Sequence, residues 1–500
     1  MVAELGDRVK RGFAWTLAGR GGQQLVSFGF GIALARLLEP ADFGLIAACL
    51  LFLEVGSTLA AAAWVRALVR RPELDEATLG VALVWQALAA LGACVLLWAL
   101  APGLAGALGQ AALAGVLAVL ALNLLWLPLQ GPAQVRLQRR LDFSAIAAAG
   151  VVEVLAFGLT AVAGALAGWG VWALVTGRIA GRGAATAVLW RCGGAPPRPR
   201  LAPAPALFAS AWRFAAKETL DDVSKNLAYL LVGWTQGVAA LGLYSRAHHL
   251  MTLPVDRLAK SLELVLYPAF AGLQAAPPAR LRAAFLKANC LMAVLAVPAL
   301  VGLALVAPLL VPALYGEKWA PAAAPLQWLC LGGVCYALEA PAVALINALG
   351  LLGSEIRRQL LHIALVAAAV AAAAWLDAGL VGVAAGVSGA ALVYAALLVW
   401  LLGRRIDLPW RNYLQSLWPA CAAAAAMAAA VGAWRHWGAL LGGGIWPLLL
   451  GAVALGALVY GGVMALFAWW RPDALCRPAL EELRGVAGGL GRRLAAAVGR

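Results

Sequence analysis

Charged residues are scarce in this chain. Asp, Glu, Lys and Arg together make up 12% of its 500 residues, whereas apolar residues make up 64%. Soluble proteins usually contain about 25% charged and about 45–50% apolar residues. A soluble fold of this length would leave too much apolar surface in water, so the composition excludes that class. It indicates a protein that exposes much of its surface to lipid.

Several signatures of enzymes and metal sites are also missing. The sequence has no P-loop ending in Gly-Lys-Ser/Thr, no Gly-x-Ser-x-Gly elbow and no His-Glu-x-x-His motif. Its eight cysteines lie singly, mostly within apolar runs, without the spacing of a zinc site or a disulfide framework. We therefore expect a protein that is not an enzyme and that needs no metal and no cofactor.

Fourteen long apolar runs, separated by short polar breaks, fill most of the chain. Most have the ~20 or more residues that a transmembrane helix requires, and the ten-residue alternation of a membrane β-barrel is missing. The sequence predicts an all-α, polytopic membrane protein with about fourteen transmembrane helices. The predicted helices are 13–38, 43–68, 77–101, 111–130, 144–167, 169–190, 208–235, 242–272, 284–314, 321–348, 355–377, 379–403, 413–434 and 444–470.

Basic residues are concentrated in every second break. The even-numbered breaks carry arginines such as Arg70, Arg71, Arg139 and Arg140, whereas the odd-numbered breaks are nearly bare, with Arg435 as the exception. Because cytoplasmic loops carry an excess of Lys and Arg, the pattern places both termini in the cytoplasm. It also accounts for the net charge of +15 without nucleic acid as a partner.

Two stretches of the chain repeat at an offset of 198 residues. "RLLEPADFGLIAA" at 36–48 resembles "WTQGVAALGLYSRA" at 234–247, with Phe43-Gly44-Leu45 aligned on Leu241-Gly242-Leu243. Two six-helix halves that repeat in the same direction are related by an axis along the membrane normal. We therefore expect a first lobe (1–190), a Pro- and Arg-rich cytoplasmic linker (191–206), a second lobe (207–403), two additional helices (404–470) and a cytoplasmic amphipathic tail (471–500).

Four stretches resemble a known family. They are "RGFAWTLAGRGGQQLVSFGFGIALARLLEPADFGL" (11–45), "LLVGWTQGVAALGLYSRAHHLMTLPVDRL" (230–258), "LVLYPAF" (264–270) and "PLLVPALYGEKWAPAAAPLQWL" (308–329). With them the chain resembles the Wzx-type polysaccharide and lipopolysaccharide flippases, nearest to the colanic-acid type, of the multidrug/oligosaccharidyl-lipid/polysaccharide exporter superfamily. In one departure from the family, the seventh predicted helix carries the acidic stretch "KETLDDVSK" (217–225).

The resemblance implies a function. It implies two six-helix lobes arranged in a V around a cavity that opens to one side of the membrane at a time. The implied cargo is undecaprenyl diphosphate carrying an oligosaccharide repeat, moved to the outer leaflet of the bacterial cytoplasmic membrane. The further partners that we expect are membrane lipid and a polysaccharide polymerase machinery. A cation-coupled multidrug exporter of the same superfamily is the alternative, and a membrane glycosyltransferase or ligase is a weaker one, because the bare breaks are short.

One polar stripe lies inside the first apolar run. Arg20, Gln23 and Gln24 are spaced so that they share a helix face. A charged side chain at the centre of a membrane helix costs about 2.5–3.5 kcal/mol on insertion scales, so it usually faces a wet cavity or a partner. Arginine matches phosphate oxygens with a planar fork of donors. The stripe is either a cavity lining for the diphosphate or an ion pair with Glu218, the residue at its repeat position.

Further intramembrane charges have more than one interpretation each. In the sixth predicted helix, Arg178 and Arg182 share a face and either extend the cationic cavity or reach back to the cytoplasmic surface. Several charged residues of the seventh helix form a network paired within itself, a cation or proton site built on Asp221 or Asp222, or a pairing between lobes; they are Lys217, Glu218, Asp221, Asp222 and Lys225. Four lone acids are either protonated or coupled to ion flow; they are Glu54, Glu153, Glu263 and Glu339.

Overall fold

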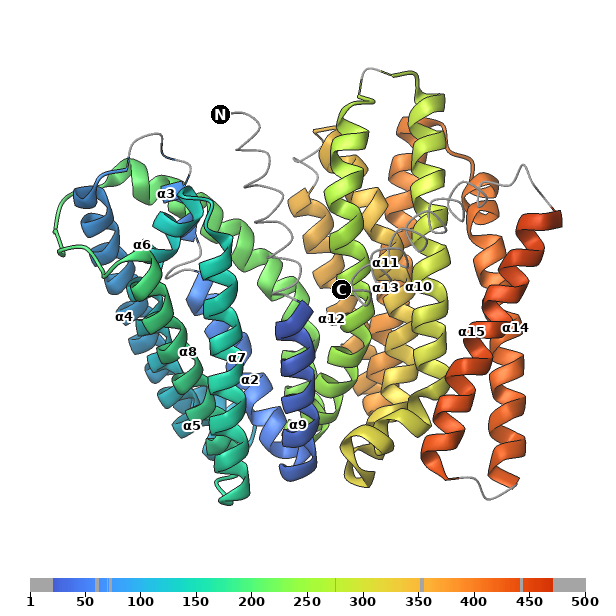
Figure 1. Cartoon of the computed structure of the whole chain (residues 1–500), viewed down its shortest axis with the longest axis horizontal. Coiled ribbons are helices and arrows are strands. Elements are labelled where there is room, and N and C mark those ends of the chain that lie inside the picture. The colour runs from blue at the N-terminus through green and yellow to red at the C-terminus, as the bar shows by residue number, and fades with distance from the viewer. Residues whose placement is uncertain are drawn as a thin grey trace, which may run out of the picture. The chain divides into compact units, whose positions relative to one another are not determined.

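The computed structural model describes residues 21–58, 63–69, 71, 74–274, 276–350, 355–440 and 444–470. In these ranges every regular element is a helix, as Figure 1 shows. The chain forms two compact units, Met1–Ser245 and Arg246–Arg500. The two six-helix lobes on either side of the linker were defined by the sequence repeat and stay a prediction. The boundary between the two compact units does not test them, because it falls within α9 and not at the linker.

The first unit begins with a helix through 21–37 and ends within α9 (Pro205–Ala271). Between them lie α2 (Pro40–Ser57), α3 (Ala63–Val69), α4 (Glu76–Ala107), α5 (Ala112–Ala121), η2 (Leu122–Leu125), α6 (Trp126–Arg139), α7 (Phe143–Leu166) and α8 (Val171–Gly193). The fourth predicted helix is thus two α-helices joined by the 3₁₀ turn η2. The predicted break at 236–242 coincides with a kink in α9: Gly237, whose φ is 82°, departs from helical geometry, and the parts of α9 on either side of it are separate helical segments.

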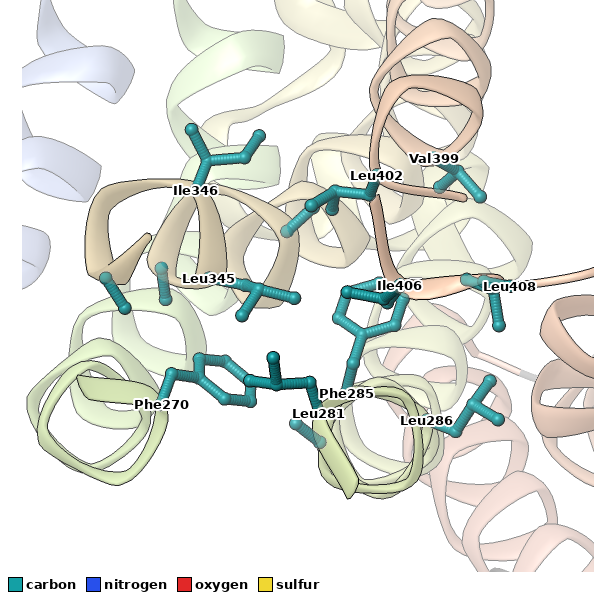
Figure 2. Close-up of a cluster of buried hydrophobic side chains, with 14 of the residues drawn as sticks. Phe270, Leu281, Phe285, Leu286, Leu345, Ile346, Val399, Leu402, Ile406 and Leu408 are labelled. Atoms are coloured by element: carbon teal, nitrogen blue, oxygen red, sulfur yellow. The ribbon is translucent and has the colours of Figure 1, made fainter. Parts of the chain in front are cut away.

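The second unit contains the rest of α9 and six further α-helices. They are α10 (Pro278–Tyr315), α11 (Ala323–Ala348), α12 (Glu355–Trp375), α13 (Gly379–Ile406), α14 (Trp410–Leu440) and α15 (Ile445–Trp470), with the 3₁₀ helix η3 (Glu317–Ala322) before α11. Figure 2 shows one apolar core of this unit, in which Phe270 and Phe285 lie near Leu345 and Ile406. Helices α14 and α15 pack on α10 through a separate cluster that includes Val306, Met427 and Leu449.

Long apolar side chains cover the outside of these helices. Leu159 of α7 is 63% exposed, and Leu458 of α15 is 74% exposed. Water would penalise such faces, whereas lipid solvates them. Eleven helices within the described ranges are long and apolar enough to cross a membrane. The chain is therefore an all-helical, multi-pass membrane protein, and the number fourteen stays a prediction. The predicted tail at 471–500 lies outside the described residues.

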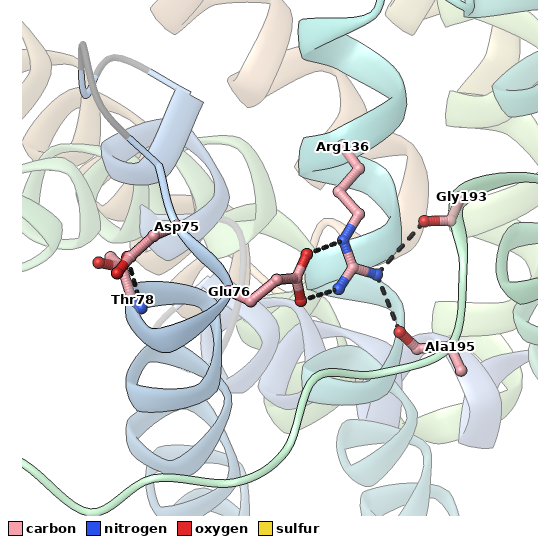
Figure 3. Close-up of polar contacts among 6 residues, drawn as sticks. All are labelled: Asp75, Glu76, Thr78, Arg136, Gly193 and Ala195. Atoms are coloured by element: carbon pink, nitrogen blue, oxygen red, sulfur yellow. Dashed lines mark hydrogen bonds and ion pairs between the residues drawn. The ribbon is translucent and has the colours of Figure 1, made fainter.

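Basic breaks of the first unit meet at one end of its helices. Arg136, at the end of α6, donates two hydrogen bonds to Glu76 at 3.1 and 2.5 Å and further bonds to the carbonyls of Gly193 and Ala195 at 3.3 and 2.8 Å (Figure 3). The linker then crosses α4, where the Trp85 indole donates to the Ala202 carbonyl at 3.1 Å. The second, fourth and sixth breaks therefore lie together, as the charge alternation requires.

Candidate functional site

A cavity of about 320 Å³ opens among the helices of the first unit. Residues of six elements line it: Ser27 from the helix through 21–37, Leu50, Leu53, Glu54 and Ser57 from α2, Asn123 and Leu124 from η2, Leu127 from α6, Glu153, Val154 and Phe157 from α7, and Arg178, Gly181 and Arg182 from α8. Of these elements, α2, α7 and the helical run from α5 through α6 are long and apolar enough to cross a membrane. The polar part of the lining therefore lies among apolar helices, where charged side chains usually face water or a partner.

Glycines of α8 bring α7 close enough to build the cavity wall. A Cβ atom on Gly177 would lie 2.9 Å from the Phe157 carbonyl oxygen, and one on Gly181 would lie 2.8 Å from the Glu153 carbonyl oxygen. Small residues four positions apart let membrane helices approach backbone to backbone. The close approach places the side chain of Glu153 beside Arg182, which follows Gly181 directly.

The cavity carries two arginines and two acids. The Nε atom of Arg182 lies 3.3 Å from an Oε atom of Glu153, and both side chains are more than a third exposed. Arg178 is a charged neighbour of Glu54 on α2. Each guanidinium therefore has an acid of the protein nearby. An arginine in such surroundings can exchange a neighbouring carboxylate for a phosphate group of similar geometry.

An amide completes the polar lining. Both side-chain atoms of Asn123 are buried, and neither has a hydrogen-bond partner. Buried amides nearly always have partners, so the unpaired amide of Asn123 is a candidate contact for a ligand in this cavity. Asn123 was not among the residues predicted from the sequence. The signal that would have found it is an asparagine within the apolar run 111–130, at the point where α5 gives way to η2.

The structure places the sequence-predicted residues in different surroundings. Arg178 and Arg182 line the cavity, together with the lone acids Glu54 and Glu153. Gln23 instead lies against α7, where its Nε2 atom donates to the Ala147 carbonyl at 3.2 Å.

Other members of the predicted set lie away from the cavity lining or outside the description. Gln24 is half-buried and does not line the cavity; Ser27, one turn further along the stripe, does. Arg20 lies outside the described residues, as do the side chains of Lys217, Asp221 and Glu263. Glu339 lies in the second unit, on α11, with one carboxylate oxygen buried and without a hydrogen bond.

The charged stretch of α9 pairs with α2. Asp222 accepts a hydrogen bond from the Thr58 hydroxyl at 2.7 Å, and Asn226 donates one to Glu54 at 2.9 Å. Glu218 is half-buried, and Lys225 is exposed. The hypothesis that this stretch pairs with the first helix through Arg20 stays a prediction. Thr58 and Asn226 were missed, because neutral hydroxyls and amides stand out less than charges in an apolar run.

Metal ligands do not gather in the part of the chain that the structure describes. No group of three or more His, Cys, Asp or Glu residues there is arranged to hold a metal ion. The seven cysteines in that part are free thiols, most of them buried.

Residues 33–324 match the family model described as "Polysaccharide biosynthesis protein". The match covers more than half of the chain. The chain belongs to this family. A curated relative, the lipopolysaccharide biosynthesis protein WzxC of Escherichia coli (strain K12), is 26% identical over 396 residues, which cover 77% of this chain and 79% of that protein.

Solved structures identify the fold. The lipid II flippase MurJ, in an inward closed conformation, superposes with a TM-score of 0.72 at 12% identity and covers 91% of this chain and 98% of its own. An inward-facing multidrug resistance MATE family transporter of the MOP superfamily gives a TM-score of 0.61 at 14% identity, over 77% of this chain and 94% of its own. The chain thus has the fold of these MOP-superfamily transporters, and the prediction that it is not an enzyme is confirmed by its family.

Proposed function

We propose that this polysaccharide biosynthesis protein is a flippase for undecaprenyl-diphosphate-linked oligosaccharide repeat units. It moves them from the inner to the outer leaflet of the bacterial cytoplasmic membrane by alternating access, for the assembly of surface polysaccharide. The observation that carries the proposal is the pair Arg178 and Arg182 in one cavity among apolar helices. The names of WzxC and of the lipid II flippase support a lipid-linked sugar as the cargo.

The diphosphate headgroup is the part of the cargo that lipid rejects most strongly. Arg178 and Arg182 lie one helical turn apart, so both guanidinium groups can bind the oxygens of one diphosphate headgroup. The lone amide of Asn123 adds neutral donor and acceptor atoms, which suit the first sugar or a phosphate oxygen. Arg20 remains a predicted member of this surface, whereas Gln23 and Gln24 lie away from the cavity lining.

Orientation follows from the arginine-rich ends. We place the end at which Arg71, Arg136 and the linker meet on the cytoplasmic side, together with both termini. A polysaccharide polymerase machinery is the partner that would consume the flipped repeat units on the other side.

A cation-coupled multidrug exporter is the second candidate. The acids Glu54 and Glu153 of the cavity favour it, because carboxylates attract organic cations. The two arginines oppose it, since they cancel the negative charge of the same lining. A binding measurement therefore decides between anionic and cationic cargo.

Binding of a short-chain prenyl diphosphate to the purified full chain tests the proposal. Arg178→Ala removes a charge-assisted contact worth about 1.5–3 kcal/mol, so we expect its dissociation constant to rise about tenfold or more. Arg178→Lys should recover part of the affinity, because lysine keeps the charge but loses the fork. Arg140→Ala is the matched control, since Arg140 is exposed at the end of α6.

Two results would contradict the assignment. Equal affinity of the wild type and Arg178→Ala for the diphosphate would remove Arg178 from the site. Tight binding of an organic cation such as tetraphenylphosphonium, with none of the prenyl diphosphate, would favour the multidrug exporter.

A further inference from the structure

Two hydrogen bonds tie α2 to the first part of α9 beside the cavity. Thr58 Oγ1 donates to Asp222 Oδ2 at 2.7 Å, and Asn226 Nδ2 donates to Glu54 Oε2 at 2.9 Å. Each helix contributes residues four positions apart, so the two bonds lie one turn from each other. Asn226 also donates to the Asp222 carbonyl at 2.9 Å, which fixes the amide between both partners. We call the two interhelical bonds the α2–α9 latch.

The other end of the same helix pair is held by backbone contact. A Cβ atom on Gly44 would lie 1.8 Å from the Val238 carbonyl oxygen, and one on Gly242 would lie 1.8 Å from the Pro40 carbonyl oxygen. Because residue numbers rise along α2 while those of its contacts fall along α9, the two helices are antiparallel. Gly237, with its φ of 82°, interrupts α9 between the glycine contact and the latch.

Glu54 belongs to both the cavity and the latch. Its side chain lines the cavity, and its charged neighbours are Asp222, Arg178 and Lys225. An anionic headgroup that pairs with Arg178 competes with Glu54 for the same guanidinium and places a second negative charge beside it. Like charges repel most strongly where water is sparse. Occupancy of the cavity therefore disfavours the present position of Glu54, which is the position that holds Asn226.

We propose that Glu54, Thr58, Asp222 and Asn226 are positioning residues that report cavity occupancy to α9. With the cavity empty, the latch holds the first part of α9 against α2. With an anionic headgroup bound, Glu54 moves, the latch opens, and this part of α9 turns about Gly237 while the glycine contact stays closed. A ligand shifts a conformational equilibrium only through different affinities for its states, and the repulsion of Glu54 supplies that difference. The inference rests on the proposed function.

Isosteric variants separate this role from binding. Thr58→Val and Asn226→Leu remove one latch bond each, outside the arginine pair. We expect transport of a lipid-diphosphate oligosaccharide to fall at least tenfold in both, while the dissociation constant of the prenyl diphosphate stays within threefold of wild type. Thr58→Ser keeps the hydroxyl and should keep transport. Thr235→Val is the matched control, because the Thr235 hydroxyl bonds only the Leu231 carbonyl of its own helix.

A reversible cross-link provides the second arm. In the full chain with Thr58→Cys and Asp222→Cys, oxidation should block transport but not binding, and a reductant should restore transport to the rate before oxidation. If the cross-linked protein transports as fast as the same protein after reduction of the disulfide, the latch is wrong. The latch is also wrong if binding, thermal stability and transport fall together in the variants. If the wild type neither binds nor moves a lipid diphosphate, the proposed function itself has failed.

Discussion

Asp142 directly precedes α7 as its N-cap residue and lies outside the membrane-spanning helices. Its carboxylate accepts hydrogen bonds from the Ser144 hydroxyl at 2.6 Å and from the Ala145 backbone N–H at 3.2 Å. These bonds, that of Ser144 first, hold the pKa of Asp142 below its ordinary value of 3.8. Both favour the ionised form, so the start of α7 is more stable when Asp142 is charged.

The N-cap of α7 makes stability depend on pH. We expect Asp142→Ala to lower the free energy of unfolding by about 1 kcal/mol at neutral pH. Because the folded pKa is the lower one, this contribution is present above the ordinary value and disappears as pH falls from about 4 through the folded pKa. Thermal unfolding of detergent-purified protein between pH 7 and pH 3 measures it. Asp377→Asn is the control, and a difference that stays constant with pH would contradict the account.

At the level of single residues, sequence reasoning found charges better than neutral polar groups. Arg178 and Arg182 stood out because a buried charge in an apolar run needs a reason. Asn123, Thr58 and Asn226 carry no charge, and their importance comes from which helix lies opposite. Gln23 shared a stripe with Arg20 by spacing alone, yet its amide bonds α7. The spacing of polar residues predicts which of them share one face of a helix, but it does not predict which other helix packs against that face.

At the level of helices, one glycine pair follows directly from the sequence repeat. Gly44 and Gly242 are equivalent positions in the two copies, and their backbones meet where α2 crosses α9. Two symmetry-related positions meet only where they lie near the axis that relates them. The repeat thus predicted the equivalence of these residues, while the contact between them required the structure.

A methyl group at this crossing should be costly. Gly44→Ala forces the backbones of α2 and α9 apart, and overpacking of this kind costs about 1–3 kcal/mol. Gly29→Ala is the matched control, because a Cβ there has no neighbour within 4 Å. In a helix, Ala is otherwise preferred to Gly by about 1 kcal/mol, so the control should be neutral or stabilising. Thermal unfolding midpoints compare the two, and equal midpoints would remove Gly44 from the contact.

Helix boundaries were predictable because lipid leaves the chain few choices. The predicted run 144–167 is α7 (Phe143–Leu166), and 355–377 is α12 (Glu355–Trp375). The 3₁₀ turn η2 was not predicted, because one neutral residue, Asn123, in an apolar run does not mark the end of a helix. The interruption at Gly237 was easier to predict, because Thr235 and Gln236 directly precede it.

At the level of the whole molecule, composition and charge alternation led to the correct class. An apolar, all-helical chain with arginine-rich ends is a polytopic membrane protein, and its fold is that of MOP transporters. In the second unit the same rule holds: Arg282 donates to the Asp407 carbonyl at 2.7 Å, so the eighth and twelfth breaks lie together. Hydropathy cannot identify a cargo, however, because the cargo is recognised by a few polar side chains.

Transport of a labelled undecaprenyl-diphosphate oligosaccharide across vesicles reconstituted with the full chain tests the central claim most directly. Cys192 is an exposed free thiol at the end of α8, so an impermeant maleimide reports which way each molecule is inserted. We expect the wild type to move the labelled lipid between leaflets, and Arg178→Ala to slow this at least tenfold at equal insertion. Movement no faster than in protein-free vesicles, with Cys192 labelling showing properly inserted protein, would contradict the account.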